Sequence, residues 1–224
     1  MVIFIIPNLL IERNQKNEKN ETIFQIEYLP NIIIVLIIMA FQQFCGINAI
    51  NNILTDIMFN TGIDIHTNLQ AAMSSLTQLI SVFIAAFNMD GIGRRRLWAL
   101  SSLGIVCSLI LYIISLKVIK YGWFRACSVF IYYLSFGHGF GPIPWFIVYD
   151  FFPKNLRLPV QTLVTFVNMI CSFCVTYLYP IMCNKIEEYQ IMIIYMCITF
   201  IALPFGLYFI PKAKNIDEDC LTLI

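Results

Sequence analysis

The sequence predicts an all-α membrane protein, built as a bundle of six transmembrane helices. The first observation is composition: 59% of the 224 residues are hydrophobic and 12% are charged, which is typical of multispanning membrane proteins. The second is a series of apolar runs, each close to the roughly 20 residues that one bilayer crossing needs. The third is the stretch GHGFGPIPWFIVYD (137–150), in which glycines and prolines interrupt an apolar run.

The apolar runs divide the chain into three parts. Residues 1–30 form a polar N-terminal linker expected in the cytoplasm, residues 31–211 form the six-helix domain, and residues 212–224 form a cytoplasmic tail. Short connections predict that consecutive helices are antiparallel neighbours. The expected crossings lie near Asn31–Phe59, Thr67–Phe87, Leu97–Leu116, Trp123–Val148, Leu158–Met182 and Gln190–Ile210.

Lysine and arginine positions predict the orientation. Short cytoplasmic loops retain more basic residues than loops on the other side. With the N-terminal linker inside, the cytoplasmic side carries ten of the 14 basic residues and the opposite side carries Lys117, Lys120, Arg125 and Lys185. Both termini are therefore expected in the cytoplasm, and an even number of crossings agrees with this.

The interrupted stretch predicts a bend within the fourth crossing. Each proline removes an intrahelical hydrogen bond, and membrane helices tolerate this where neighbours or a wet cavity satisfy the freed backbone groups. Such breaks cluster around the binding sites of transporters. The expected hinge residues are Gly139, Gly141, Pro142 and Pro144.

Neutral amides mark the first crossing. The segment FQQFCGIN places Gln42, Gln43 and Asn48 in an apolar environment, where an amide costs several kcal/mol (of order 2–7) unless it is paired or hydrated. Their spacing puts them on neighbouring parts of one helical surface. Two interpretations remain open: a polar lining of a cavity, or hydrogen bonds that pack one helix against another.

Composition and spacing also argue against several classes of protein. A net charge of +1 with scattered basic residues does not favour a nucleic-acid partner. The pair Cys171 and Cys174 has redox or zinc spacing, but its apolar context favours packing. We expect no metal site and no cofactor. A membrane enzyme is disfavoured because no catalytic cluster is evident, so no residue is assigned a catalytic role.

Four motifs in order carry a resemblance to a known family. They are FQQFCGIN in the first crossing, DGIGRRR after the second, GFGPIPW in the fourth and FFPKNLR after it. The chain resembles helices seven to twelve of the sugar-porter family of the major facilitator superfamily, over about Asn31–Pro211. Gly137 and the GFGPIPW form are most similar to the insect trehalose and glucose carriers of this family. The resemblance implies one half of a major-facilitator fold in the lipid bilayer of the plasma membrane.

The resemblance also implies a sugar site. A sugar offers hydroxyls that both donate and accept hydrogen bonds, which suits neutral amides, and an apolar face, which suits an indole. By resemblance, the central cavity is lined by Gln42, Gln43, Asn48, Gln78, Trp145 and Asn168. The expected substrate is trehalose or a hexose such as glucose. Asn51 and Asn52 stand where the family generally has aromatic residues.

A charge network is implied at the cytoplasmic side. By resemblance, its members close the inner gate: Asp90, Arg94, Arg95, Asp150 and Arg157. The alternative is that Arg94, Arg95 and Arg96 only anchor the topology. For the whole chain, the resemblance implies facilitated sugar transport together with a complementary N-terminal half. The alternative is a truncated membrane protein that binds or regulates a full-length transporter without transporting sugar.

Overall fold

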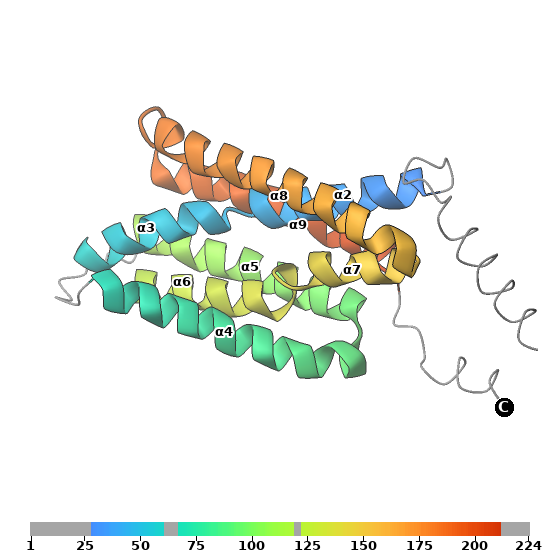
Figure 1. Cartoon of the computed structure of the whole chain (residues 1–224). Coiled ribbons are helices and arrows are strands. Elements are labelled where there is room, and N and C mark those ends of the chain that lie inside the picture. Colours follow the sequence, from blue (N-terminus) through green and yellow to red (C-terminus); the bar gives the residue numbers. More distant parts are fainter. Residues whose placement is uncertain (1–27, 61–66, 119–121, 212–224) are drawn as a thin grey trace, which may run out of the picture.

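The helices of this protein lie side by side along one common direction (Figure 1). The computed structural model describes residues 28–60, 67–118 and 122–211, and the predicted cytoplasmic segments lie almost wholly outside these residues. The elements are α2 (Leu29–Phe44), α3 (Ile47–Asn60), α4 (Thr67–Ile92), α5 (Arg94–Lys117), α6 (Gly122–Ser135), the π-helix η1 (Phe136–Phe140), α7 (Ile143–Phe151), α8 (Lys154–Cys183) and α9 (Glu188–Phe209).

The first predicted crossing is two helices in series. α2 ends at Phe44 and α3 begins at Ile47. Between them Gly46 has φ +93°, a left-handed conformation that suits glycine. A Cβ on Gly46 would also lie 2.7 Å from the ring of Tyr195 in α9. The break therefore needs glycine for two reasons, backbone conformation and space.

The fourth predicted crossing is divided into three helical pieces. α6 has 14 residues, η1 has five and α7 has nine, so none alone reaches the roughly 20 residues of a full crossing. The bend expected from the glycines and prolines is present as a π-helix followed by a turn at Gly141 and Pro142. Pro144 lies in the first turn of α7, where its missing N–H removes no helical hydrogen bond.

The core of the bundle lies around α5, which packs against both α6 and α9. Trp98 of α5 is fully buried, stacks on Phe140 with ring centroids 4.0 Å apart, and donates a 3.0 Å hydrogen bond to the carbonyl of Ala202. Gly206 of α9 gives the indole room, because a Cβ there would lie 2.1 Å from Trp98 Nε1. α5 thus fixes both the C-terminal helix and the bent segment.

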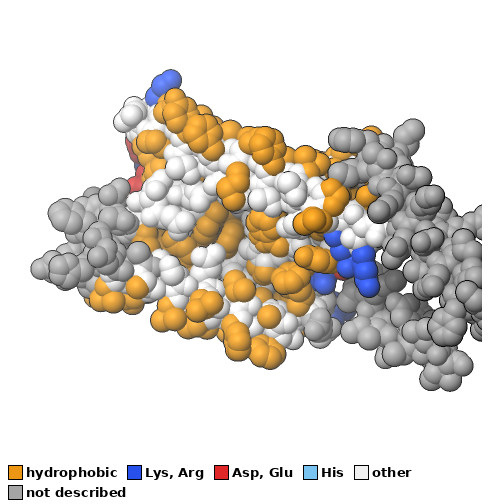
Figure 2. All heavy atoms as spheres, in the orientation of Figure 1, with side chains coloured by type: hydrophobic (Ala, Val, Ile, Leu, Met, Phe, Trp, Pro, Cys, Tyr) orange, Lys and Arg blue, Asp and Glu red, His pale blue; other side chains and the backbone are white. Residues whose placement is uncertain are grey.

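The surface of the bundle is suited to lipid. Among the residues that the structure describes, five helical stretches are long and apolar enough to cross a membrane: Leu29–Leu54, Ala72–Met89, Arg94–Lys117, Lys154–Cys183 and Glu188–Phe209. Large apolar side chains on α4 are exposed on the surface, with Phe83 65% and Phe87 71% exposed. Such exposure is unfavourable in water and suits contact with lipid. Figure 2 shows hydrophobic side chains along the length of the bundle and lysines and arginines gathered near the α7 end.

Candidate functional site

Gln42 of α2 joins three parts of the bundle. Its Nε2 donates a 2.5 Å hydrogen bond to the carbonyl of Gly141, and its Oε1 accepts a 3.0 Å bond from Asn168 Nδ2 of α8. Gln42 is 4% exposed and Asn168 is 3% exposed. These bonds offset the cost of burying the amides. We call Gln42, Asn168 and the Gly141 carbonyl the Gln42 network.

A second network lies beside the first, one turn further along α8, and joins α8 to the end of α2 and the start of α3. Asn48 Nδ2 contacts two acceptors, Gln43 Oε1 at 2.9 Å and Ser172 Oγ of α8 at 2.8 Å. Gln43 and Asn48 are both half-buried. Asn168 and Ser172 are four residues apart and share a face of α8. α8 therefore meets both networks along one line, and we call Gln43, Asn48 and Ser172 the Asn48 network.

Trp145 lies near the start of α7, four residues after Gly141. It is half-buried and packs against the hydrophobic core. Its backbone N–H bonds the carbonyl of Pro142 at 3.1 Å. Within the described part of the chain, no hydrogen bond is found for its indole N–H. The ring thus offers an apolar face and a free donor, the two features that suit a sugar.

Gln78 is not brought into either network. It lies half-buried on α4, and its backbone carbonyl would lie 3.0 Å from a Cβ on Gly137. The backbone of α4 at Gln78 therefore lies beside the π-helix. Among the described residues, no hydrogen bond links the Gln78 side chain to the amides of α2 and α8.

Glycine allows the bent segment to approach its neighbours closely. A Cβ on Gly139 would lie 2.6 Å from the carbonyl oxygen of Leu97 on α5, and one on Gly137 would lie 2.8 Å from Ser81 Cβ on α4. Gly141 N–H bonds the carbonyl of Phe136 at 2.8 Å, five residues earlier, as in a π turn. The segment is thus held by backbone contacts that larger residues would prevent.

Arg94 and Asp150 form an ion pair between the start of α5 and the end of α7. Arg94 also donates to the carbonyl of Phe146 at 3.4 Å. The two side chains are 23% and 31% exposed, so water weakens the attraction without removing it. The structure brings these two members of the predicted charge network together.

The other predicted members behave differently. Arg157 donates to the carbonyls of Phe152 at 3.0 Å and Tyr149 at 3.1 Å, and so binds the C-terminal end of α7. Arg95 is half-buried, and no ion pair links it to another described residue. The side chain of Asp90 lies outside the described residues.

Several polar partners were not identified from the sequence. Tyr133 OH donates to Asn51 Oδ1 at 2.6 Å, and Tyr132 OH donates to the carbonyl of Cys45 at 3.1 Å. Ser172 joins the Asn48 network. The only available signal for Ser172 was its spacing of four residues from Asn168, which by itself is weak.

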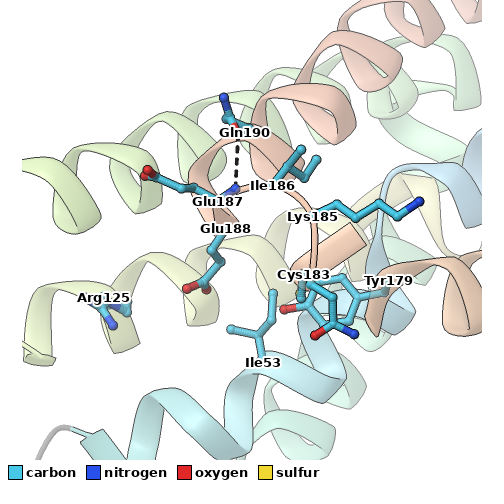
Figure 3. A pocket seen from close by; sticks show the side chains of 10 residues that line it. Ile53, Arg125, Tyr179, Cys183, Lys185, Ile186, Glu187, Glu188 and Gln190 are labelled. Carbon is cyan, nitrogen blue, oxygen red and sulfur yellow. Dashed lines mark hydrogen bonds between the residues drawn. The ribbon is translucent and has the colours of Figure 1, made fainter. Parts of the chain in front are cut away.

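Two pockets lie away from these residues. One of about 760 Å³ opens where α8 and α9 meet, and its lining includes Arg125 and Glu188 (Figure 3). The other, of about 280 Å³, lies between α4, α5 and the bent segment and is lined by His138. None of the predicted sugar-binding residues lines either pocket. The amides instead lie on the helices α2, α3 and α8, bonded to one another.

Long apolar helices, a broken helix and paired neutral amides define a multipass membrane protein of the transporter class. The sequence matches the model of the family described as "Sugar (and other) transporter" over residues 9–219. The chain therefore belongs to this sugar transporter family, a family of transporters and not of enzymes.

Insect trehalose transporters are among its relatives. The chain is 31% identical over 205 residues to the facilitated trehalose transporter Tret1 of Bombyx mori, covering 88% of this chain and 41% of that protein. It is 29% identical over 199 residues to the Tret1 of Apis mellifera ligustica, covering 86% and 40%. The chain thus spans less than half of the length of these relatives.

Solved transporters share the fold. The major facilitator proton:xylose symporter XylE, bound to 6-bromo-6-deoxy-D-glucose, superposes with a TM-score of 0.72 at 20% identity, covering 82% of this chain and 40% of that one. An inward-open structure of the E. coli xylose transporter gives 0.69 at 20% identity, covering 91% and 43%. At this identity the likeness concerns the fold: this chain has the fold of half a major-facilitator transporter.

Proposed function

We propose that this chain supplies the C-terminal half of a sugar transporter, which carries trehalose or a hexose such as glucose by facilitated diffusion and alternating access. The single observation that carries the proposal is the pair of amide networks joining α2 and α3 to α8 beside the broken helix. In major-facilitator proteins substrate lies between two halves that rock about a midplane site. A second, N-terminal half is therefore the partner in this proposal.

The chemistry of the networks supports a sugar ligand. Each amide has two N–H donors and an oxygen with two lone pairs. Gln42 uses one donor and one acceptor position, and Asn48 uses its nitrogen, so donors and acceptors remain for hydroxyls. The half-buried indole of Trp145 adds an apolar ring and an N–H that no acceptor among the described residues takes up. No charged side chain belongs to either network, which suits a neutral ligand.

The ion pair between Arg94 and Asp150 supports an inner gate. It joins the start of α5 to the end of α7, next to the broken helix. Breaking such a pair costs free energy, so its strength biases the equilibrium between two conformations. In this proposal both termini are cytoplasmic, the host is the plasma membrane, and the pair closes the cytoplasmic side.

Uptake in cells tests the proposal directly. The chain is co-expressed with the part of the Bombyx mori transporter that it does not cover, and entry of labelled trehalose and glucose is measured. We expect uptake above that of either part alone, and a fall on the order of tenfold for Gln42→Ala or Trp145→Ala, because each removes a contact with the sugar. Uptake that is unaffected by both substitutions contradicts the proposal.

Thr162→Ala provides the matched control for that experiment. Thr162 lies on α8, like Asn168, but is exposed, and its hydroxyl bonds the carbonyl of Leu158 in its own helix at 3.0 Å and no other residue in the described ranges. Its loss should leave uptake within about twofold. Surface amounts of every variant are measured by biotinylation, so that a loss of protein is not read as a loss of binding.

A second candidate function is that of a regulatory subunit, which binds a complete transporter without transporting sugar. Co-expression with a full-length relative distinguishes the two functions. A regulator lowers the uptake of the full-length protein, whereas a transporter half leaves it unchanged and restores uptake only with the missing half.

A further inference from the structure

One hydroxyl from another helix bridges a backbone N–H and a backbone carbonyl of the π turn. In a π turn, an N–H bonds the carbonyl five residues earlier rather than four. Ser135 and Phe140 are such a pair at the start of η1. Ser101 of α5 accepts a 2.9 Å hydrogen bond from Phe140 N–H, and its hydroxyl donates a 2.6 Å bond to the carbonyl of Ser135. Both members of the pair therefore contact the same oxygen.

The backbone of η1 comes close to Ser101 because Gly139 has no side chain. Ser101 is 1% exposed, and its Cβ would lie 2.8 Å from a Cβ on Gly139. The glycine brings the backbone of η1 against α5, so that the short serine side chain reaches both backbone groups. Ser81 of α4 donates to the preceding carbonyl, that of Leu134. Two neighbouring helices thus hold consecutive carbonyls at the point where the helix changes from α to π.

The hydrogen-bond register of this π turn sets how Gly141 and α7, which follow it, are rotated about the helix axis. Successive residues of an α-helix are rotated by about 100°. Tightening the π turn into an α turn would rotate Gly141 and α7 by an angle of this size relative to α6. The Gly141 carbonyl would then leave Gln42 Nε2, to which it is bonded at 2.5 Å, and the Trp145 ring would turn with it.

We propose that Ser101 is a positioning residue, which holds the bent segment in its π register and thereby sets where Gly141 and Trp145 lie. Its role in sugar transport rests on the proposed function above. The structural part, that one hydroxyl on α5 holds the π turn, stands on the hydrogen bonds alone. Ser101 acts through the backbone and needs no contact with the sugar.

Hydrogen exchange of the full chain in lipid nanodiscs tests the structural part without any sugar. Amide exchange is followed by mass spectrometry over residues 136–145, where Pro142 and Pro144 have no N–H. In Ser101→Ala the Phe140 amide loses the hydroxyl as an acceptor and the π turn loses its hydrogen-bonded link to α5, and we expect this amide to exchange about tenfold faster. Ser101→Cys, which keeps the size but bonds weakly, should lie between Ala and the native chain.

Ser102→Ala is the matched control. Ser102 is equally buried and adjacent, but among the described residues its hydroxyl bonds only the carbonyl of Trp98 in its own helix, at 2.7 Å. It should leave exchange at Phe140 unchanged. Equal acceleration in Ser101→Ala and Ser102→Ala, or none in Ser101→Ala, overturns the proposal. If Ser101→Ala is too unstable to purify, the comparison of Ser101→Cys with Ser102→Cys replaces it.

The functional part is measured by trehalose uptake in the two-part system described above. Ser101→Ala should lower uptake at least about fivefold, and Ser102→Ala should not. Absence of uptake in the native system would contradict the proposed function and leave the exchange result to decide on Ser101. Accelerated exchange with normal uptake would show that Ser101 holds the π turn but does not position the sugar site.

Discussion

Gln42 and Asn168 are hydrogen-bonded to each other in a buried, apolar setting. The stability losses caused by substituting them should therefore not be additive. Asn168→Leu leaves Gln42 Oε1 buried without a donor, which should cost about 1–3 kcal/mol of stability. Gln42→Met leaves Asn168 Nδ2 without its acceptor at similar cost, and it also removes the donor to the Gly141 carbonyl, a loss that the single and the double variant share. The double variant should cost clearly less than the sum, because neither orphan remains.

The measurement is thermal unfolding of the four proteins in one detergent. The double-mutant cycle gives the interaction free energy between the two side chains. A coupling near zero would mean that the 3.0 Å bond between them contributes little in the membrane protein, and that the amides are free for other partners.

Arg94 and Asp150 allow a second prediction at this scale. Arg94→Gln removes the ion pair, and because both side chains are partly exposed the loss should be about 0.5–1 kcal/mol. The exposed residue Arg96 gives the control, since Arg96→Gln should change stability by less. Exchanging the charges, Arg94→Asp with Asp150→Arg, should restore part of the loss in a thermal melt, and no recovery would argue that the pair is incidental.

At the scale of elements, the packing of α5 against α9 depends on one glycine. Gly206→Ala places a methyl group 2.1 Å from Trp98 Nε1, and the indole is fixed by its stacking on Phe140 and its bond to Ala202. We expect a loss of about 1–3 kcal/mol from overpacking, seen as a lower Tm.

Gly91→Ala is the control for this prediction. A Cβ on Gly91 of α4 meets nothing within 4 Å, and alanine favours a helix more than glycine does. This variant should be neutral or slightly stabilising. If Gly206→Ala melts like the native chain, α5 and α9 are less tightly packed than described.

At the scale of the whole molecule, the predicted orientation can be tested by labelling. Cys183 is exposed at the end of α8, beside the large pocket. Gly91 and Gly93 mark the opposite end, at the α4–α5 junction. With both termini in the cytoplasm, a variant that retains only Cys183 should react with a membrane-impermeant maleimide added outside intact cells. Gly91→Cys in a cysteine-free background should react only after permeabilisation, and the reverse pattern would invert the topology.

Composition and the length of the apolar runs explain how much of the fold could be predicted from the sequence. A bilayer requires long apolar helices, so composition and run length were sufficient to expect a helical membrane bundle. The interrupted fourth crossing was also expected, because proline and glycine act locally. The sequence did not predict whether the interruption would be a π-helix or a kink. In our proposal this depends on the hydroxyl of Ser101, which is 39 positions away from Phe140 in the sequence.

The sequence by itself determined that this chain crosses a membrane as helices, that the fourth crossing is interrupted, and that neutral amides lie within the helices, whereas the break at Gly46 was seen only in the structure. These properties follow from local chemistry, because the nonpolar interior of a bilayer leaves the backbone few conformations other than the helix. Only the tertiary structure decided that Gln42 bonds Asn168, 126 positions away, that Ser172 joins Asn48, and that Arg157 binds the end of α7 while Arg94 takes Asp150. Hydrogen bonds and ion pairs are short-ranged and directional, so partners on different helices are set by how the helices pack.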